Sequence, residues 1–181
     1  MKSKLCHSIV CLVVPGMLLL ASCRQAPGDE KAPVLTNEEE KEMLLRVNKF
    51  LVQKDYELIE AYAERRGWDM EVTENGLFYE IFEEFAGSGL SDGMKVKLSY
   101  NVSLLDGTLC YSSDNDGAKE FVLGKSMEIT GLEQGVGMMK AGEKARFIIP
   151  PHLAYGLLGD ENRIPARSII VYEVELLEAG L

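Results

Sequence analysis

Residues 128–156 read EITGLEQGVGMMKAGEKARFIIPPHLAYG. In this stretch a helical pattern is followed by a strand and then by a loop, and this order decides the fold. We predict a short helix over residues 130–139 and an apolar strand over residues 143–149. The strand stops at Pro150 and Pro151, and a Tyr155-Gly156 pair follows soon after. Because proline cannot donate a hydrogen bond to a sheet, the chain is expected to leave the sheet there and to carry Tyr155 on a loop.

On both sides of this stretch, apolar side chains recur at every second position. The alternating apolar residues are Val96, Leu98, Tyr100, Val102 and Leu104, and later Ile170, Tyr172, Val174 and Leu176. Such alternation is typical of strands with one buried face. Asp106-Gly107 is expected to turn the first strand back as a hairpin, and further strands are expected at residues 77–84 and near Phe121. Strands around a short helix predict an α+β fold, with an antiparallel sheet wrapped over that helix.

The first 22 residues have the layout of a secretory signal. Lys2 and Lys4 precede a mostly apolar run that ends in small residues. The alternative is a membrane-spanning helix, but His7 and Pro15 interrupt the run. Residues 19–23, LLASC, resemble the bacterial lipobox, which implies removal of residues 1–22 and diacylation of Cys23.

Residues 23–35 hold two prolines and a glycine, and are predicted to form a short tether. A capping box of Thr36 and Glu39 then opens a predicted helix that runs to Arg66, within a helical segment over residues 36–75. The stripe along this helix is expected to pack either on its own domain or on a second copy of the chain. Its residues are Leu44, Val47, Leu51, Leu58 and Tyr62.

Composition excludes several classes of function. The formal net charge of −10 disfavours contact with nucleic acid or with anionic headgroups.

Once the signal is removed and Cys23 is acylated, Cys110 is the one cysteine left with a free thiol, so no disulfide within the mature chain is expected. His152 is then the remaining histidine. We find no metal-ligand cluster, no phosphate-binding glycine loop and no Ser-His-Asp pattern, so neither a metal nor a cofactor is predicted.

Several blocks from residue 76 onward resemble the FKBP-type peptidyl-prolyl cis-trans isomerases. They are VKLSYNVSLLDGT at residues 96–108, EFVLG at 120–124, the stretch quoted above, and its closing HLAYG at 152–156. The resemblance implies an FKBP-like domain over residues 76–181, with a strongly curved sheet around the short helix. The helical preface and the loop GDENRIP further resemble the lipoprotein members, including the gliding-motility-associated isomerases.

The resemblance also implies a set of site residues. In this family the substrate proline sits in an apolar pocket, which here would be formed by Tyr100, Phe121, Ile129, Leu132, Ile164 and Tyr172. The backbone N–H of Ile129 would bind a substrate carbonyl, and the hydroxyl of Tyr155 would donate to a neighbouring one. We therefore expect Tyr155, Ile129 and Tyr100 to act in catalysis and the remaining residues to bind substrate.

The sequence also departs from the family at the expected pocket. Cys110-Tyr111 stands where the family usually has Phe-Asp, Leu132 stands in place of a common tryptophan, and Lys119 in place of an aromatic residue. Tyr111 is a candidate to supply the missing ring and is included among the substrate-binding residues. Cys110 is either a small buried residue or a redox switch, and the first interpretation is favoured.

Two functions are therefore predicted from the resemblance. The first is a proline isomerase that assists the folding of exported proteins, anchored in the bacterial envelope through Cys23 and facing the periplasm from the outer membrane. The second is a chaperone or assembly lipoprotein of the same fold that binds proline-containing segments with little turnover. In both cases the partners are proline-containing unfolded or exported polypeptides, and a homodimer through the N-terminal helix is left open.

Overall fold

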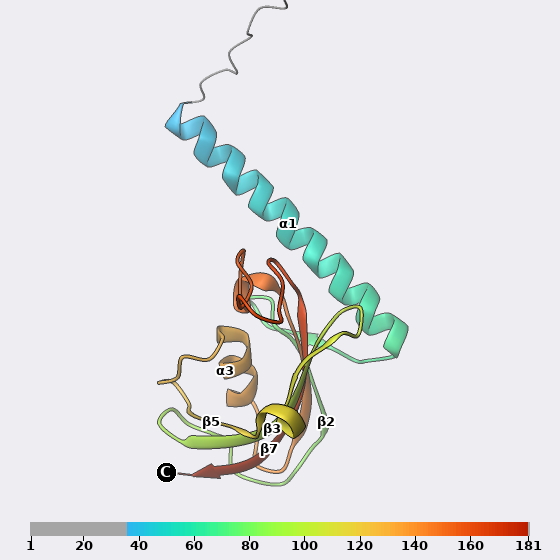
Figure 1. Cartoon of the computed structure of the whole chain (residues 1–181), viewed down its shortest axis with the longest axis vertical. Helices are drawn as coiled ribbons and strands as arrows, with labels where there is room; N and C mark the ends of the chain where they lie inside the picture. The colour runs from blue at the N-terminus through green and yellow to red at the C-terminus, as the bar shows by residue number, and fades with distance from the viewer. Residues whose placement is uncertain (1–35, 181) are drawn as a thin grey trace, which may run out of the picture.

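The computed structural model describes residues 36–180, which form one antiparallel sheet, one long helix and several short helices (Figure 1). The elements are α1 (Asn37–Arg66), β1 (Glu71–Val72), β2 (Phe78–Glu83), β3 (Lys95–Leu104), β4 (Leu109–Ser112), α2 (Ser113–Asp116), β5 (Lys119–Val122), α3 (Thr130–Gly137), β6 (Lys144–Ile149), the short 3₁₀ helix η1 (Pro151–Leu153) and β7 (Ile170–Gly180). The predicted signal peptide, Cys23 and the tether lie outside the described residues. No helix within residues 36–180 has the length and apolar character needed to cross a bilayer.

The sheet has the strand order β1-β2-β6-β7-β3-β4, and all its pairs are antiparallel. Strands β4 and β5 both pair with β3 along one edge, β5 with its first half and β4 with its second. The α+β class and the antiparallel sheet over a short helix are thereby confirmed. The strand β1 and the helices α2 and η1 were not predicted.

Helix α3 packs closely on β6 because glycines face the strand. A Cβ atom on Gly131 would lie 2.3 Å from the Ile149 side chain, and one on Gly135 would lie 2.8 Å from the Phe147 ring. Both distances are far inside van der Waals contact, so this approach requires glycine at both positions. Phe147 and Ile149 are fully buried in the main core between the sheet and α3.

Helix α1 covers the opposite face of the sheet. Ile59, Tyr62 and Ala63 form a second core with sheet residues such as Ile148 and Val171. Since β6 is covered on both faces, its side chains alternate between the two cores, which explains why residues 145–149 are almost continuously apolar. Thr36 and Glu39 form the predicted capping box, with the Thr36 N–H donating to Glu39 at 2.9 Å.

The predicted apolar stripe on α1 does not pack on its own domain over most of its length. Tyr62 is buried, but Leu44, Val47 and Leu58 are each about half exposed, and the helix projects well beyond the sheet (Figure 1). The buried face instead includes a charged residue, Asp55, which is 7% exposed. The expectation that α1 packs on its own domain is therefore correct only for its C-terminal half.

Candidate functional site

A pocket of about 270 Å³ opens at the edge of the main core. Its lining consists of Tyr100, Tyr111, Asp116, Lys119, Tyr155 and Tyr172. Tyr100 on β3 and Tyr172 on β7 lie on the α3 side of paired strands, with ring centroids 6.2 Å apart. The structure thus brings together the tyrosines that sequence analysis assigned to one site.

The other expected site residues lie in the core with these tyrosines. Phe121, Leu132 and Ile164 are buried in the same core cluster, and Ile129 is half-buried against it. Ile129 is also the residue that precedes α3, and its side chain does not cap that helix. Among the described residues, the Ile129 N–H has no hydrogen-bond partner, so this donor at a helix N-terminus is available to a ligand.

Tyr155 occupies its place because of the loop that begins at the two prolines. Pro150 and Pro151 start the 3₁₀ helix η1, and the Gly156 N–H donates to the Pro151 carbonyl at 2.8 Å. Gly156 has a left-handed φ of 60°, which glycine adopts readily. The chain therefore turns sharply on both sides of Tyr155, whose side chain packs on the main core and lines the pocket.

Tyr111 forms a link that the sequence did not predict. Its hydroxyl donates a hydrogen bond to the Asp160 carboxylate, which also accepts from the N–H groups of Ile164 at 2.7 Å and Asn162 at 3.0 Å. Burial acts to raise the pKa of Asp160, but the hydrogen bonds from Tyr111 and Ile164 outweigh it and hold that pKa below its usual value. A charged Asp160 thereby ties β4 to the loop that carries Ile164.

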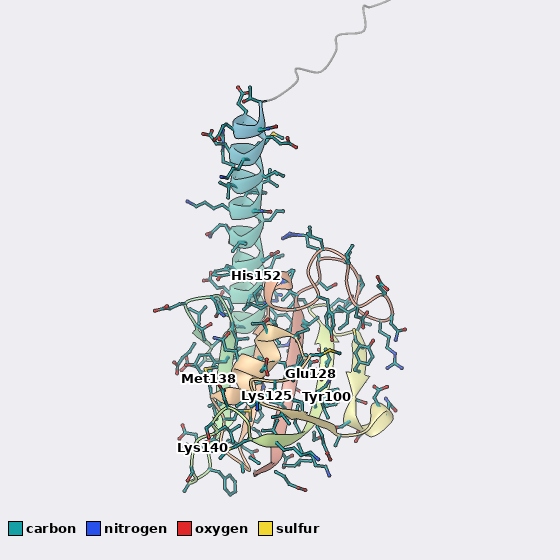
Figure 2. All side chains as sticks on the ribbon, turned by 90° about the vertical axis from the view of Figure 1, so that its left-hand side faces the viewer. Tyr100, Lys125, Glu128, Met138, Lys140 and His152 are labelled. Atoms are coloured by element: carbon teal, nitrogen blue, oxygen red, sulfur yellow. The ribbon has the colours of Figure 1, made fainter. Side chains whose placement is uncertain are left out.

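Two ion pairs border the pocket. Lys119 Nζ lies 2.9 Å from both carboxylate oxygens of Glu128 and 5.5 Å from the centroid of the Tyr100 ring. Arg163 Nη1 lies 3.2 Å from Asp116 on the other side. Figure 2 shows Tyr100 and Glu128 close together in front of the sheet. Asp116, which lines the pocket, was not predicted from the sequence. Nor were Glu128 and Asp160, the partners of the lining residues Lys119 and Tyr111. The one sequence signal of a charged border was Lys119, which stands in place of an aromatic residue.

The comparison with known families decides the identity of this fold. Residues 87–177, which are half of the chain, match the family model described as FKBP-type peptidyl-prolyl cis-trans isomerase. The chain belongs to this family.

Similar proteins agree with this assignment. Human peptidyl-prolyl cis-trans isomerase FKBP9 is 45% identical over 92 residues, which cover 49% of this chain and 16% of the human protein. FK506-binding protein 2 of Dictyostelium discoideum is 42% identical over 86 residues, or 47% of this chain and 65% of that protein. The crystal structure of FkpA from Escherichia coli aligns with a TM-score of 0.60 at 27% identity, covering 80% of this chain and 73% of FkpA. The chain thus spans under a fifth of the length of its human relative.

In this FKBP domain the pocket offers hydroxyl donors and apolar surface rather than a nucleophile. Burial raises the pKa of Tyr155 and of Tyr172 above the ordinary tyrosine value, and the negative charge of Glu128 adds to both shifts. Both hydroxyls therefore stay protonated at neutral pH. No group of residues suited to holding a metal ion occurs within residues 36–180.

The raised pKa of Tyr155 predicts how stability and activity depend on pH. Because the folded protein favours the neutral hydroxyl, the pKa of Tyr155 lies above its unfolded value of 10.0. Stability from this group is present below that value and is lost as the pH rises through the folded pKa. Any activity that needs the Tyr155 hydroxyl should be constant from about pH 6 to about pH 9. A rate measured across this range that falls with a midpoint near pH 8 would contradict this assignment.

Cys110 is buried in the FKBP core and does not face the pocket as a reactive group. It is 4% exposed, and its Sγ lies 3.6 Å from the Arg163 carbonyl oxygen. Burial, together with the charges of Asp160 and Asp106, raises the pKa of the Cys110 thiol. These surroundings favour the interpretation of Cys110 as a small core residue rather than a redox switch.

Cys110 should accordingly resist alkylation in the native protein. With iodoacetamide at pH 8, we expect modification at least about 100-fold slower than in the protein unfolded by guanidinium, because reaction needs an exposed thiolate. Mass spectrometry of the peptide that contains Cys110 gives both rates. Equal rates in the two states would show that the thiol is accessible and would reopen the interpretation as a redox switch.

Proposed function

We propose that this protein is a peptidyl-prolyl cis-trans isomerase. The observation that supports this most directly is the pocket lined by four tyrosines, in a chain of the FKBP family whose Ile129 N–H has no hydrogen-bond partner within residues 36–180. A proline ring of a bound polypeptide would lie among Tyr100, Tyr172 and the buried side chains of Phe121 and Ile164.

The physical chemistry of the X-Pro bond explains how such a pocket acts. Resonance opposes rotation by about 18–20 kcal/mol. Twisting the amide removes this resonance and makes the carbonyl less dipolar, so an apolar surface stabilises the twisted state relative to the planar one. The Ile129 N–H and the Tyr155 hydroxyl would hold substrate carbonyls in the twisted geometry. Lowering the barrier by about 5.5 kcal/mol accelerates the reaction about 10⁴-fold.

The clients and the location belong to the same proposal. We infer that the enzyme serves proline-containing segments of exported, unfolded polypeptides in the bacterial envelope. The apolar N-terminal run and the lipobox-like LLASC support this location, with acylated Cys23 as the anchor in the outer membrane and the domain facing the periplasm. The tether and the projecting half of α1 would hold the pocket away from the membrane surface.

A homodimer through α1 is a further part of this proposal. The projecting half of α1 carries exposed apolar side chains, including Leu44, Val47 and Phe50. A group of exposed apolar side chains is typical of a contact surface. Sedimentation equilibrium would show a dimer if this face pairs, and a monomer at micromolar concentration would contradict the pairing.

A holding function with little turnover is the second candidate. The observation in its favour is Tyr111, which stands in place of a family acid and bonds to Asp160 instead. In this case the pocket would bind proline segments without lowering the rotational barrier. The same pocket would serve both functions, so only a rate can separate them.

The test is the rate of cis-trans isomerisation of short X-Pro peptides. The variants are Tyr155→Phe alone and with Phe121→Ala, and the matched control is Tyr79→Phe, whose hydroxyl bonds to Glu71 outside the pocket. We expect the purified protein and the control to accelerate the reaction by orders of magnitude and the double variant to lose this effect. Circular dichroism checks that each variant is folded. Wild-type protein no faster than buffer would refute the isomerase proposal.

A further inference from the structure

The loop that carries Tyr155 and Ile164 is tied directly to helix α1. Arg167, at the end of this loop, places Nη2 2.7 Å from each carboxylate oxygen of Asp55 on α1. The same nitrogen lies 3.3 Å from the Leu51 carbonyl oxygen. Asp55 is 7% exposed, so the ion pair lies largely out of solvent, where it is screened less than a surface pair.

The backbone of Arg167 closes the loop next to Tyr155. Its N–H donates to the Gly156 carbonyl at 2.9 Å, and the Gly156 N–H donates to Pro151 at 2.8 Å. Arg167 has a left-handed φ of 58°, which costs a non-glycine residue about 1–2 kcal/mol. Such a conformation persists when its surroundings fix it from several sides, as the carboxylate of Asp55 and the carbonyl of Gly156 do here.

Within residues 36–180, no hydrogen bond other than those of Arg167 joins this loop to α1. A hollow of about 410 Å³ lies between them, with Leu51 and Val52 of α1 on one side and Pro151 and Leu157 on the other. A separate hydrogen bond joins His152 Nε2 to the Asn75 carbonyl at 3.0 Å, and Figure 2 shows His152 beside α1. Ile169 packs on α1 just beyond the loop. Within the loop itself, where the hollow separates the side chains, the hydrogen bonds of Arg167 to Asp55 and Leu51 hold the Gly156 side against the helix.

We propose that Asp55 is a positioning residue for the substrate pocket. Through Arg167 it fixes the loop from residue 156 to residue 167, and thereby the place of Tyr155 and Ile164. Helix α1 lies outside residues 87–177, the segment that matches the family, so this contact adds a support that the matched domain does not contain. The effect on catalysis rests on the isomerase function proposed above, whereas the effect on the loop does not.

The test compares three single variants of the full chain. Asp55→Asn removes the charge and keeps the shape, and Asp55→Glu restores the charge. The matched control is Glu57→Gln, which breaks an exposed ion pair on the same helix, between Lys54 and Glu57 at 2.7 Å. Arg167 is partly exposed, so water can solvate it in Asp55→Asn and the variant is expected to fold. The two readouts are amide hydrogen exchange and kcat/KM on X-Pro peptides.

Hydrogen exchange should change in the loop alone. The reporting amides are those of Gly156, Gly159 and Ile164, each hydrogen-bonded within the loop. We expect about 10-fold faster exchange at these amides in Asp55→Asn, with unchanged exchange in β6 and β7, because local opening has its own free energy. Glu57→Gln should match the wild type, and Asp55→Glu should recover most of the protection. Unchanged loop amides, or equal acceleration throughout the sheet, would overturn the proposal.

The second readout is kcat/KM on X-Pro peptides. In Asp55→Asn, kcat/KM should fall about 2- to 30-fold, the range usual for residues that act through a network. The effect should largely vanish when Tyr155→Phe is already present, since Asp55 acts through the loop of Tyr155. If exchange changes but kcat/KM does not, Asp55 holds the loop without serving catalysis and the proposal fails. If the wild type has no activity, the isomerase function fails, and hydrogen exchange still decides whether Asp55 fixes the loop.

Discussion

Replacement of Phe147 by alanine is expected to lower the free energy of unfolding by about 3–5 kcal/mol, the usual range for a fully buried phenylalanine. Phe147 lies on β6 with no exposed surface, and its ring sits against Gly135 of α3. Without the ring, a cavity opens between sheet and helix, and the glycine surface of α3 cannot fill it. Urea unfolding followed by circular dichroism measures the loss.

The control for this prediction is Phe85→Ala. Phe85 is 57% exposed, so its removal should change stability by no more than about 0.5 kcal/mol. A loss below about 1 kcal/mol in Phe147→Ala, or equal losses in both variants, would mean that the core between β6 and α3 is not packed as described.

Replacement of Gly159 by alanine is expected to reduce kcat/KM about 100-fold, as a displacement of about 1 Å in a catalytic group can do. Gly159 has φ +77°, and a Cβ there would lie 2.3 Å from the Ile164 carbonyl oxygen. The backbone of Ile164 and Pro165 must therefore move away, and this displaces Ile164 together with the neighbouring Asp160. Steady-state kinetics on X-Pro peptides gives the effect.

Gly67→Ala is the matched control for backbone strain. Gly67 ends α1 with φ +66°, and no atom lies within 4 Å of the position that a Cβ would take, so alanine there strains the backbone without a clash. It should lower stability by about 1–2 kcal/mol and leave kcat/KM unchanged. If Gly159→Ala has no larger effect on kcat/KM than Gly67→Ala, the close approach within the loop does not determine the pocket.

Local patterns were sufficient to predict the sheet and the loop of Tyr155. Strand β3 was predicted because its apolar residues alternate, and alternation depends only on which face of a strand is buried. Tyr155 was predicted to stand out on a loop because Pro150 and Pro151 end β6 whatever the rest of the chain does. Both features depend on residues that are close together in the chain, so they can be read directly from the sequence.

The buried face of α1 could not be read in the same way. Its apolar residues lie on several sides of the helix, and which side is covered depends on Ile148 and Val171 of distant strands. Asp55 was overlooked because a charged residue on a helix usually faces solvent. Its partner Arg167 lies 112 residues further along the chain, and no local pattern links the two.

The charged border of the pocket was missed for a related reason. Asp160 and Tyr111 are separated by 49 residues, and their hydrogen bond depends on the folded path of the loop. The family pattern indicated that Tyr111 replaces an acid, but it did not indicate that an acid at position 160 approaches the same place. The resemblance to the family could therefore suggest candidate site residues, whereas contacts specific to this chain could not be read from it.

The most direct test of the central claim is exchange spectroscopy by NMR on a peptide with one X-Pro bond, using catalytic amounts of the purified protein. The cis and trans isomers of the free peptide interconvert over tens to hundreds of seconds, which is too slow to give exchange peaks between their signals. We predict exchange peaks between the two isomers with wild-type protein, and their loss with the Tyr155→Phe, Phe121→Ala variant. Broadened peptide signals without exchange peaks would show binding without catalysis and would contradict the isomerase function.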